Sequence, residues 1–252
     1  MTYCVGILVR EGLVMIGDTR TNAGVDNIAT FRKLHLFETP GERAIGFASS
    51  GNLSVAQSVL SMVTEGFRNH DTGEVERLLG VDSMFGAAQL VGRAIREVHR
   101  FGNLSKEQSQ SGLFDVTILL GGQIRGGRLR LFMIYSAGNF IEATADTPYL
   151  QIGEHKYGKP ILDRSIKSDT GLADALKLGL ISMDSTIRSN LSVGLPIDIL
   201  TIRRDTYEPD TVYRIEDGEP YFHDLREAWS SALRAAHQAI PTPPYPPRHG
   251  DA

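Results

Sequence analysis

The chain has 252 residues, of which 41% are hydrophobic and 22% are charged. This balance is ordinary for a globular protein and leaves enough apolar residues for one large core. A formal net charge of −4 argues against nucleic acid or an anionic membrane as the main partner. Cys4 is the single cysteine, so no intrachain disulfide is possible. With no predicted signal peptide or membrane span, the cytoplasm is the expected compartment.

Strands dominate the first fifty residues. The first two are expected to pair as a hairpin through Gly12, and a loop rich in glycine, asparagine and aspartate follows. Asn52 or Ser54 then caps a helix, and a second helix is expected over 83–101. The alternation of apolar and polar residues places the strands at 2–9, 13–17, 32–37 and 44–50.

The rest of the chain repeats this order. Strands are expected at 115–121, 129–136 and 140–144, helices at 154–162 and 172–188, and closing strands at 197–203 and 212–215. No linker interrupts the chain, so we expect one domain over 1–239, followed by a disordered proline-rich tail at 240–252. Two mainly antiparallel sheets between helix pairs would bury both inner sheet faces. The predicted fold class is therefore α+β, a four-layer αββα sandwich.

The basic stretch 125–130 is interpreted as the solvent face of a strand after a turn.

Thr2 follows Met1 directly and carries the first chemical signal. Removal of Met1 would expose a residue with both a hydroxyl nucleophile and a free α-amine. Because the amine has a reference pKa of about 8, a useful fraction is unprotonated near neutral pH and can accept the hydroxyl proton. Many chains begin Met-Thr without any catalytic role, so Thr2 alone does not predict an enzyme.

Several segments accompany this N-terminus. They are TYCVG at residues 2–6, GDTRT at 17–21, Lys33, GFASS at 46–50, GEHKYGKP at 153–160 and SNLSVGLP at 189–196. In this order the chain resembles the β-type subunits of proteasomes over roughly residues 2–203. It is most similar to Anbu, the bacterial proteasome homologue called the ancestral β subunit. The resemblance implies an N-terminal nucleophile hydrolase with the αββα fold.

The resemblance implies roles for three residues. Thr2 would be the nucleophile once Met1 is removed, and Asp18 and Lys33 match the carboxylate and lysine that the family pairs. A cation close to the threonine hydroxyl favours the alkoxide and keeps the α-amine more neutral. Taken singly, Asp18 is more often a turn residue at a strand end, and Lys33 is more often a surface lysine at a strand edge. Together with Thr2 at the family spacing, they favour catalysis.

Ser49 matches the position whose backbone N–H stabilises the oxyanion of the transition state in this family. The family often has glycine there, but a backbone donor does not depend on the side chain if the geometry holds. Ser50 lies beside it. The alternative interpretation is a tight strand-to-helix turn that requires small residues.

Two segments depart from the family pattern. Glu154 falls where proteasome β subunits usually carry serine, and its carboxylate is expected near the Thr2 amine as a modulator of the site. The later aspartate and serine of the family align with Ser189 and Ser192. The aspartate is therefore missing unless Asp184 reaches the site.

These residues predict a threonine hydrolase that cleaves amide or peptide bonds and needs neither cofactor nor metal. A single domain cannot hide its nucleophile from folded proteins, so we expect self-assembly into a large homo-oligomer, either a ring or an open stack. No nucleic acid or membrane partner is expected. A catalytically weak or inactive scaffold subunit and a small-amide acylase are the alternatives.

Overall fold

A computed structural model describes residues 2–22, 28–69, 72–101, 112 and 114–245. The chain divides into two compact units, residues 1–217 and 218–252. The predicted domain limits at 239 and 240 stay a prediction, and the last seven residues of the predicted tail lie outside the described residues. Among the described residues, no helix combines the length and apolar character needed to cross a membrane.

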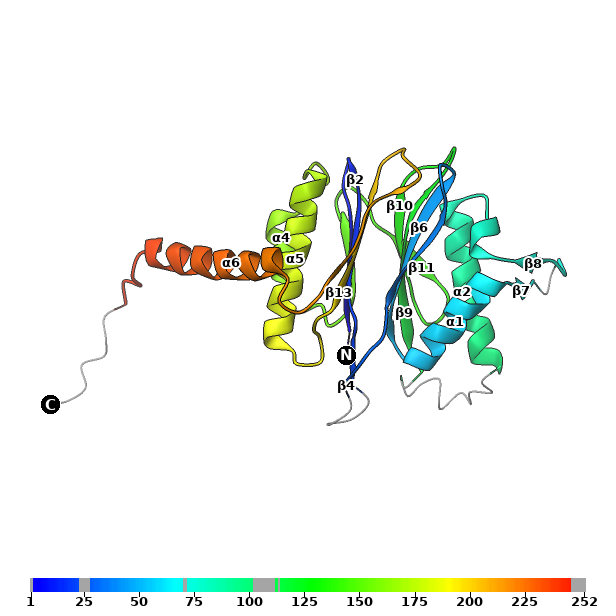
Figure 1. Ribbon diagram of the computed structural model, residues 1–252, viewed down its shortest axis with the longest axis horizontal. Coiled ribbons are helices and arrows are strands. Elements are labelled where there is room, and N and C mark those ends of the chain that lie inside the picture. The colour runs from blue at the N-terminus through cyan, green and yellow to red at the C-terminus, as the bar shows by residue number, and fades with distance from the viewer. Residues whose placement is uncertain (1, 23–27, 70–71, 102–111, 113, 246–252) are drawn as a thin grey trace. The chain divides into compact units, whose positions relative to one another are not determined.

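Two five-stranded antiparallel sheets face each other in the first unit (Figure 1). One sheet has the order β12-β1-β2-β13-β14 and the other the order β11-β10-β9-β6-β5. The first sheet consists of β1 (Tyr3–Leu8), β2 (Gly12–Asp18), β12 (Tyr149–Gly153), β13 (Ile197–Arg203) and β14 (Pro209–Ile215). The second consists of β5 (Leu34–Thr39), β6 (Arg43–Gly51), β9 (Val116–Ile124), β10 (Arg130–Ile134) and β11 (Phe140–Glu142).

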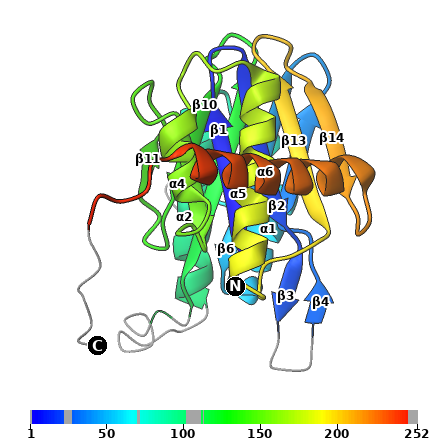
Figure 2. The same ribbon diagram turned by 90° about the vertical axis from the view of Figure 1, so that its left-hand side faces the viewer.

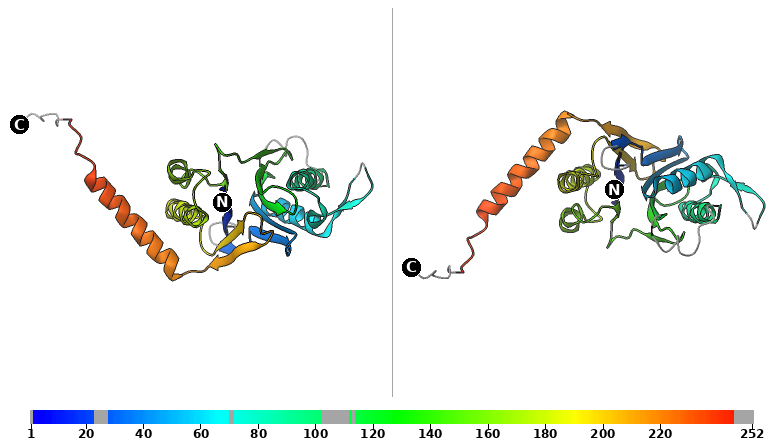
Figure 3. Two further views of the ribbon diagram at one scale, coloured as in Figure 1. Left: turned by 90° about the horizontal axis from the view of Figure 1, so that it is seen from above. Right: turned by 90° about the horizontal axis from the view of Figure 1, so that it is seen from below.

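A helix pair covers the outer face of each sheet, as the views along the layers show (Figures 1 and 3). The pair α4 (Lys159–Ser165) and α5 (Leu172–Ser189) packs on the first sheet, mainly through α5 on β1 and β2. The pair α1 (Leu53–Glu65) and α2 (Met84–Phe101) packs on the second sheet. The predicted four-layer αββα sandwich is therefore confirmed.

Strand β6 shows how the sequence builds two cores at once. Successive strand side chains point to opposite faces, so Ile45 and Phe47 pack toward α1 and α2, whereas Ala44 and Ala48 face the other sheet. The inward residues are small because space there is filled from the opposite side. A Cβ on Gly46 would lie 2.5 Å from the Met15 sulfur. The two sheets approach each other closely because small residues on one sheet lie opposite large residues on the other.

Several local features differ from the sequence-based expectation. Strand β12 was not predicted, and the helix expected from residue 154 begins at Lys159. The predicted loop after β2 contains a short hairpin of β3 (Arg20–Asn22) with β4 (Ile28–Thr30). Figure 2 shows this hairpin at the same end of the sandwich as the N-terminus. Helix α1 is followed by a small two-stranded sheet of β7 (Phe67–Arg68) and β8 (Val75–Glu76), which the sequence did not predict.

The second unit holds a helix that was not predicted from the sequence. Helix α6 (Pro220–Ala239) begins with proline at its first turn, where the missing N–H is tolerated. The Glu219 carboxylate caps it by accepting the Phe222 N–H at 2.7 Å. Residues 240–245 continue without helix or strand, and the remaining tail lies outside the described part of the chain.

Candidate active site

The β1–β2 hairpin positions the N-terminus beside Asp18. Cys4 pairs with Gly17, so the next residue along β2 lies next to the start of β1. The Tyr3 N–H donates to Asp18 Oδ1 at 3.0 Å. Asp18 is completely buried. Local strand pairing thus brings together two of the predicted site residues, Thr2 and Asp18, although they are sixteen positions apart in the chain.

Lys33 forms a buried ion pair with Asp18. Its Nζ lies 2.8 Å from Asp18 Oδ1 and also donates to the Arg20 carbonyl at 2.6 Å. The Lys33 side chain is only 5% exposed. The interpretation of Lys33 as a surface lysine is therefore wrong, because its ammonium is buried against Asp18 at the end of β2 and Arg20 at the start of β3. A buried ammonium needs such partners, since an unpaired charge in the interior is very costly.

The Asp18 carboxylate is held by groups from three segments of the chain. Gly194 donates its N–H to Oδ2 at 3.4 Å, in addition to the contacts from Tyr3 and Lys33. Burial raises the pKa of the Asp18 carboxyl, and the Lys33 charge and these hydrogen bonds act in the opposite direction. The geometry therefore couples the charge of Asp18 to that of Lys33.

Arg20 links two parts of this region, a role that the sequence alone does not indicate. Its guanidinium donates to the Leu191 carbonyl at 3.0 Å, and a Cβ on Gly194 would lie only 2.3 Å from the guanidinium carbon. Arg20 therefore connects the Lys33 contact to the loop that supplies the Gly194 amide. Only the GDTRT motif marked it, and that motif does not show where its side chain lies.

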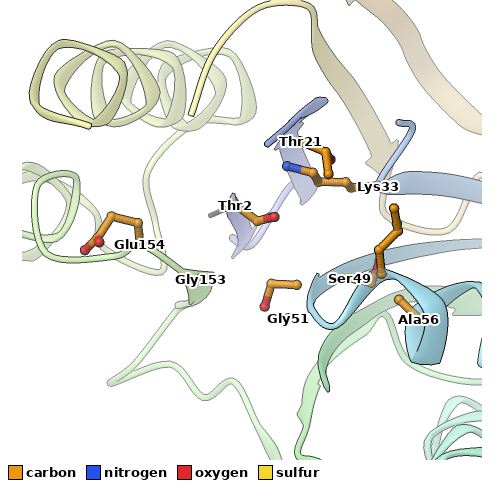
Figure 4. A pocket seen from close by; sticks show the side chains of 10 residues that line it. Thr2, Thr21, Lys33, Ser49, Gly51, Ala56, Gly153 and Glu154 are labelled. Carbon is orange, nitrogen blue, oxygen red and sulfur yellow. The ribbon is translucent and has the colours of Figure 1, made fainter. Parts of the chain in front are cut away.

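A pocket of about 640 Å³ opens at this end of the sandwich. Figure 4 shows Thr2, Lys33 and Ser49 around it, with Glu154 at its opposite side. Its walls are formed by Thr2, Thr21, Lys33, Ser49, Ser50, Gly51, Leu53, Ala56, Gly153 and Glu154. Its size is typical of a small-ligand or peptide site. Four predicted site residues thus line one cavity, and Asp18 is bonded to one of them.

The Ser49 amide is already used by the fold. It donates to the Lys33 carbonyl at 3.1 Å, because Leu34 pairs with Ala48 and extends the ladder by one bond. As an oxyanion donor, this N–H would have to share that bond. The role assigned to Ser49 from the sequence stays a prediction.

The Gly51 amide lies on the same edge of β6 and is better placed. Antiparallel ladders alternate the direction of successive N–H groups. The Asn52 N–H donates at 2.8 Å to the carbonyl of Asp115, the residue before β9, so the Gly51 N–H points to the other side. Strand β5 begins at Leu34 and does not reach it. Gly51 lines the pocket, where its φ of +102° suits glycine.

Glu154 is connected to the N-terminus and to the 190–192 loop. Its N–H donates to the Thr2 carbonyl at 2.7 Å, and its carboxylate accepts the Asn190 Nδ2 at 3.2 Å. The Asn190 amide oxygen in turn accepts the Ser192 N–H at 3.0 Å. In Figure 4 the Glu154 side chain points away from Lys33. Asn190 therefore fixes the carboxylate, a role that the sequence did not indicate.

The remaining predicted residues do not line the pocket. Ser189 is exposed at the last residue of α5, and Ser192 is half-buried beside Asn190. Asp184 is buried on α5, where its carboxylate accepts the Arg188 guanidinium at 3.0 Å. No cluster of three or more metal-binding side chains occurs among the described residues.

Comparisons with known proteins identify the class. No protein-family model matches the chain. Proteasome subunit beta 2 of Pyrobaculum islandicum is 24% identical over 214 residues, which are 82% of this chain and 93% of the relative. The fold, the pocket and this similarity define a proteasome β-type protein of the N-terminal nucleophile hydrolase family.

Solved structures narrow the class to one family. Anbu (ancestral beta-subunit) from Yersinia bercovieri is 47% identical, with a TM-score of 0.88 over 97% of this chain and 99% of that chain. Anbu from Hyphomicrobium sp. strain MC1 is 48% identical, with a TM-score of 0.85 over 95% and 98%. The helical assembly of the Anbu complex from Pseudomonas aeruginosa is 45% identical, with a TM-score of 0.87 over 96% and 98%. The chain belongs to the Anbu family.

Proposed function

We propose that the chain is a threonine hydrolase that cleaves amide or peptide bonds once Met1 is removed. The observation that carries this proposal is the buried Lys33–Asp18 ion pair, whose lysine lines the same pocket as Thr2. The Thr2 hydroxyl attacks the substrate carbonyl and passes its proton to the α-amine. An ester forms, the amine of the substrate leaves, and water then releases the acyl group.

Each neighbouring group has a place in this cycle. The Lys33 ammonium stabilises the developing alkoxide of Thr2 and disfavours protonation of the α-amine, because like charges repel. Asp18 holds that ammonium in position. The Gly51 N–H serves as the oxyanion donor, alone or with the Ser49 N–H. A preorganised backbone donor of this kind is worth about a hundred- to a thousand-fold in rate.

The experiment that tests the proposal is hydrolysis of a mixed peptide library, followed by mass spectrometry. The processed protein is expected to release fragments, and the Thr2→Ala variant is expected to release none. Equal patterns from both proteins would leave the scaffold alternative as the better account. Cleavage of acyl amides but not of peptides would favour the acylase.

Processing of the N-terminus is the first requirement. Protein expressed in bacterial cytoplasm is expected to begin at Thr2, because threonine is small enough for methionine removal. Intact-mass measurement and N-terminal sequencing check this directly. Retention of Met1 in the assembled protein under all conditions would deprive the mechanism of its base.

Glu154 is expected to shift the pH dependence of turnover. An opposite charge near the α-ammonium favours the protonated amine, and each pKa unit corresponds to about 1.4 kcal/mol. Activity should therefore rise toward alkaline pH, and Glu154→Gln should move the profile to lower pH. Glutamine retains an oxygen that can accept the Asn190 amide, so the hydrogen bond of this side chain can persist.

The matched control for this prediction is Glu74→Gln, which removes one exposed carboxylate elsewhere. It changes the net charge by the same amount and should leave the profile where it was. An unshifted profile in Glu154→Gln would show that its carboxylate is not coupled to the nucleophile.

Self-assembly into a large homo-oligomer is part of the proposal. One of the Anbu structures is described as a helical assembly. An assembly would restrict access to the Thr2 pocket, which a single 27.6 kDa subunit cannot do. Light scattering should report a mass many times that of the subunit, and a strict monomer at high concentration and low salt would contradict this. The cytoplasmic location and the absence of a nucleic acid partner stay predictions.

A further inference from the structure

A second pocket lies at the opposite end of the sandwich from Thr2. Strand β1 begins next to Thr2 and ends at Leu8, and six strand residues span about 20 Å. The pocket has a volume of about 450 Å³ and is lined by residues of the turns that follow β1, β9 and β13. Four arginines line it, together with the single acidic residue Glu142; we call it the far-end arginine pocket, and its arginines are Arg10, Arg128, Arg130 and Arg204.

The charge of this pocket opposes that of the whole chain. Four arginines and one glutamate give the lining a net charge of +3, whereas the chain carries −4. Charges of one sign gathered in a concave site attract a counter-ion strongly. The rest of the chain, by contrast, is net acidic.

The two most exposed arginines of the pocket have no described partner. Arg10 and Arg128 are exposed, and neither guanidinium has a hydrogen-bond or ion-pair partner within the described part of the chain. The single glutamate is already engaged, because Glu142 accepts both Nε and Nη2 of Arg130, at 2.7 and 2.6 Å. The pocket therefore holds positive charge that no described residue neutralises.

Hydrogen bonds of one buried side chain connect two of the turns that carry these arginines. Gln123 is only 1% exposed, and its amide nitrogen donates to the Gly127 carbonyl at 2.9 Å and to Asp205 Oδ1 at 2.7 Å. Its amide oxygen accepts the Asp205 N–H at 2.8 Å. Gly127 precedes Arg128 and Asp205 follows Arg204, so one glutamine sets the spacing of two arginine-bearing turns.

Arg204 is hydrogen-bonded to a third turn, the one that contains Val9 and Arg10. Its guanidinium donates to the Arg10 carbonyl at 2.6 Å and to the Val9 carbonyl at 3.1 Å. The turn that follows it contains two non-glycine residues with positive φ, Asp205 at 64° and Tyr207 at 60°. Such conformations persist only where the surroundings impose them, and they gather at functional sites. Hydrogen bonds between the turns thus hold the arginine-bearing backbone in place, as a binding site requires.

We propose that the far-end arginine pocket binds a compact polyphosphate, a small molecule with two or more linked phosphoryl groups. A guanidinium presents a planar fork that matches phosphate oxygens. A phosphoryl group offers up to three oxygens and can contact arginines from different turns, whereas one carboxylate offers a single edge. The binding is independent of the Thr2 chemistry.

The test is isothermal titration calorimetry of the full-length assembled protein with inorganic tripolyphosphate at low salt. The wild-type protein is expected to bind, and added NaCl should weaken the binding. The double variant Arg10→Gln/Arg128→Gln should bind at least ten times more weakly. Its fold should be unchanged in thermal unfolding, because both side chains are exposed and unpaired. The control Arg68→Gln/Arg234→Gln removes two exposed arginines outside the pocket and should change the affinity less than twofold.

Three further ligands define the class. Orthophosphate and citrate should each bind at least ten times more weakly than tripolyphosphate. Adenosine triphosphate binding tighter than tripolyphosphate would identify a nucleotide that also contacts the apolar wall at Leu8, and equal affinity would identify the phosphate chain alone as the ligand. No binding by the wild type, equal losses in the two double variants, or citrate binding as tight as tripolyphosphate would overturn the proposal.

Discussion

Lys33→Ala is expected to abolish turnover and to destabilise the fold at the same time. Turnover should fall by about a hundred- to ten-thousand-fold, the usual contribution of a group that assists proton transfer. Because Lys33 and Asp18 are both buried, removing one partner leaves an unpaired charge, which costs about 3–5 kcal/mol. A surface lysine at a strand edge, the alternative interpretation of Lys33, would contribute little to stability. Chemical denaturation and peptide hydrolysis measure the two effects.

Two variants separate chemistry from folding. Lys159→Ala is the control and removes the ion pair between Lys159 and Asp163, whose side chains are each about half exposed. The loss of this pair should lower the free energy of unfolding by about 0–1 kcal/mol. The double variant Asp18→Asn/Lys33→Met removes both buried charges and should recover much of the stability but none of the activity. Full activity in Lys33→Ala would show that this ion pair does not serve the nucleophile.

Gly51→Ala is expected to have the second largest effect. A Cβ at this position would lie 2.2 Å from the Asp115 carbonyl oxygen, which belongs to backbone and cannot rotate away. The positive φ adds strain for any residue with a side chain. Together these should cost about 2–6 kcal/mol, since overpacking costs about 1–3 kcal/mol and a strained backbone a similar amount. The displaced amide should also lower turnover by about a hundred- to a thousand-fold.

Gly73→Ala is the control for backbone strain alone. Gly73 has a φ of +76°, and nothing lies within 4 Å of a Cβ placed there. It should lose about 1 kcal/mol and retain its turnover. A Gly51→Ala protein that loses stability but hydrolyses peptides at the normal rate, measured below its unfolding temperature, would remove Gly51 from the proposed oxyanion site.

The sequence predicted those elements whose own residues show a strand pattern, a helix pattern or a helix cap. Strand β13 has the predicted limits, 197–203, and α5 differs from its prediction by one residue at its end. Asn52, one of two predicted caps, accepts the Val55 N–H at 3.1 Å and begins α1. Strand β12 has no such signal. Its five residues form a strand because they pair with β1, nearly 150 positions earlier in the chain.

Four residues that line the pocket were named from the sequence, but their geometry was not predicted. Thr2, Lys33, Ser49 and Glu154 were named from the sequence, and they line one pocket. Burial of Lys33 depends on how β2, β3 and β5 come together, and no local pattern reports that. The direction of the Ser49 amide depends on strand register, because a shift by one residue reverses every N–H along the strand.

Covalent labelling of the nucleophile tests the central proposal most directly. The processed protein is incubated with an epoxide-type probe that reacts with N-terminal threonine, and its intact mass is measured before and after. We expect one adduct per subunit, located at Thr2 by fragmentation, that is absent in Thr2→Ala and strongly reduced in Lys33→Ala. A processed, folded protein that forms no adduct at Thr2 at any pH would contradict the proposed threonine nucleophile.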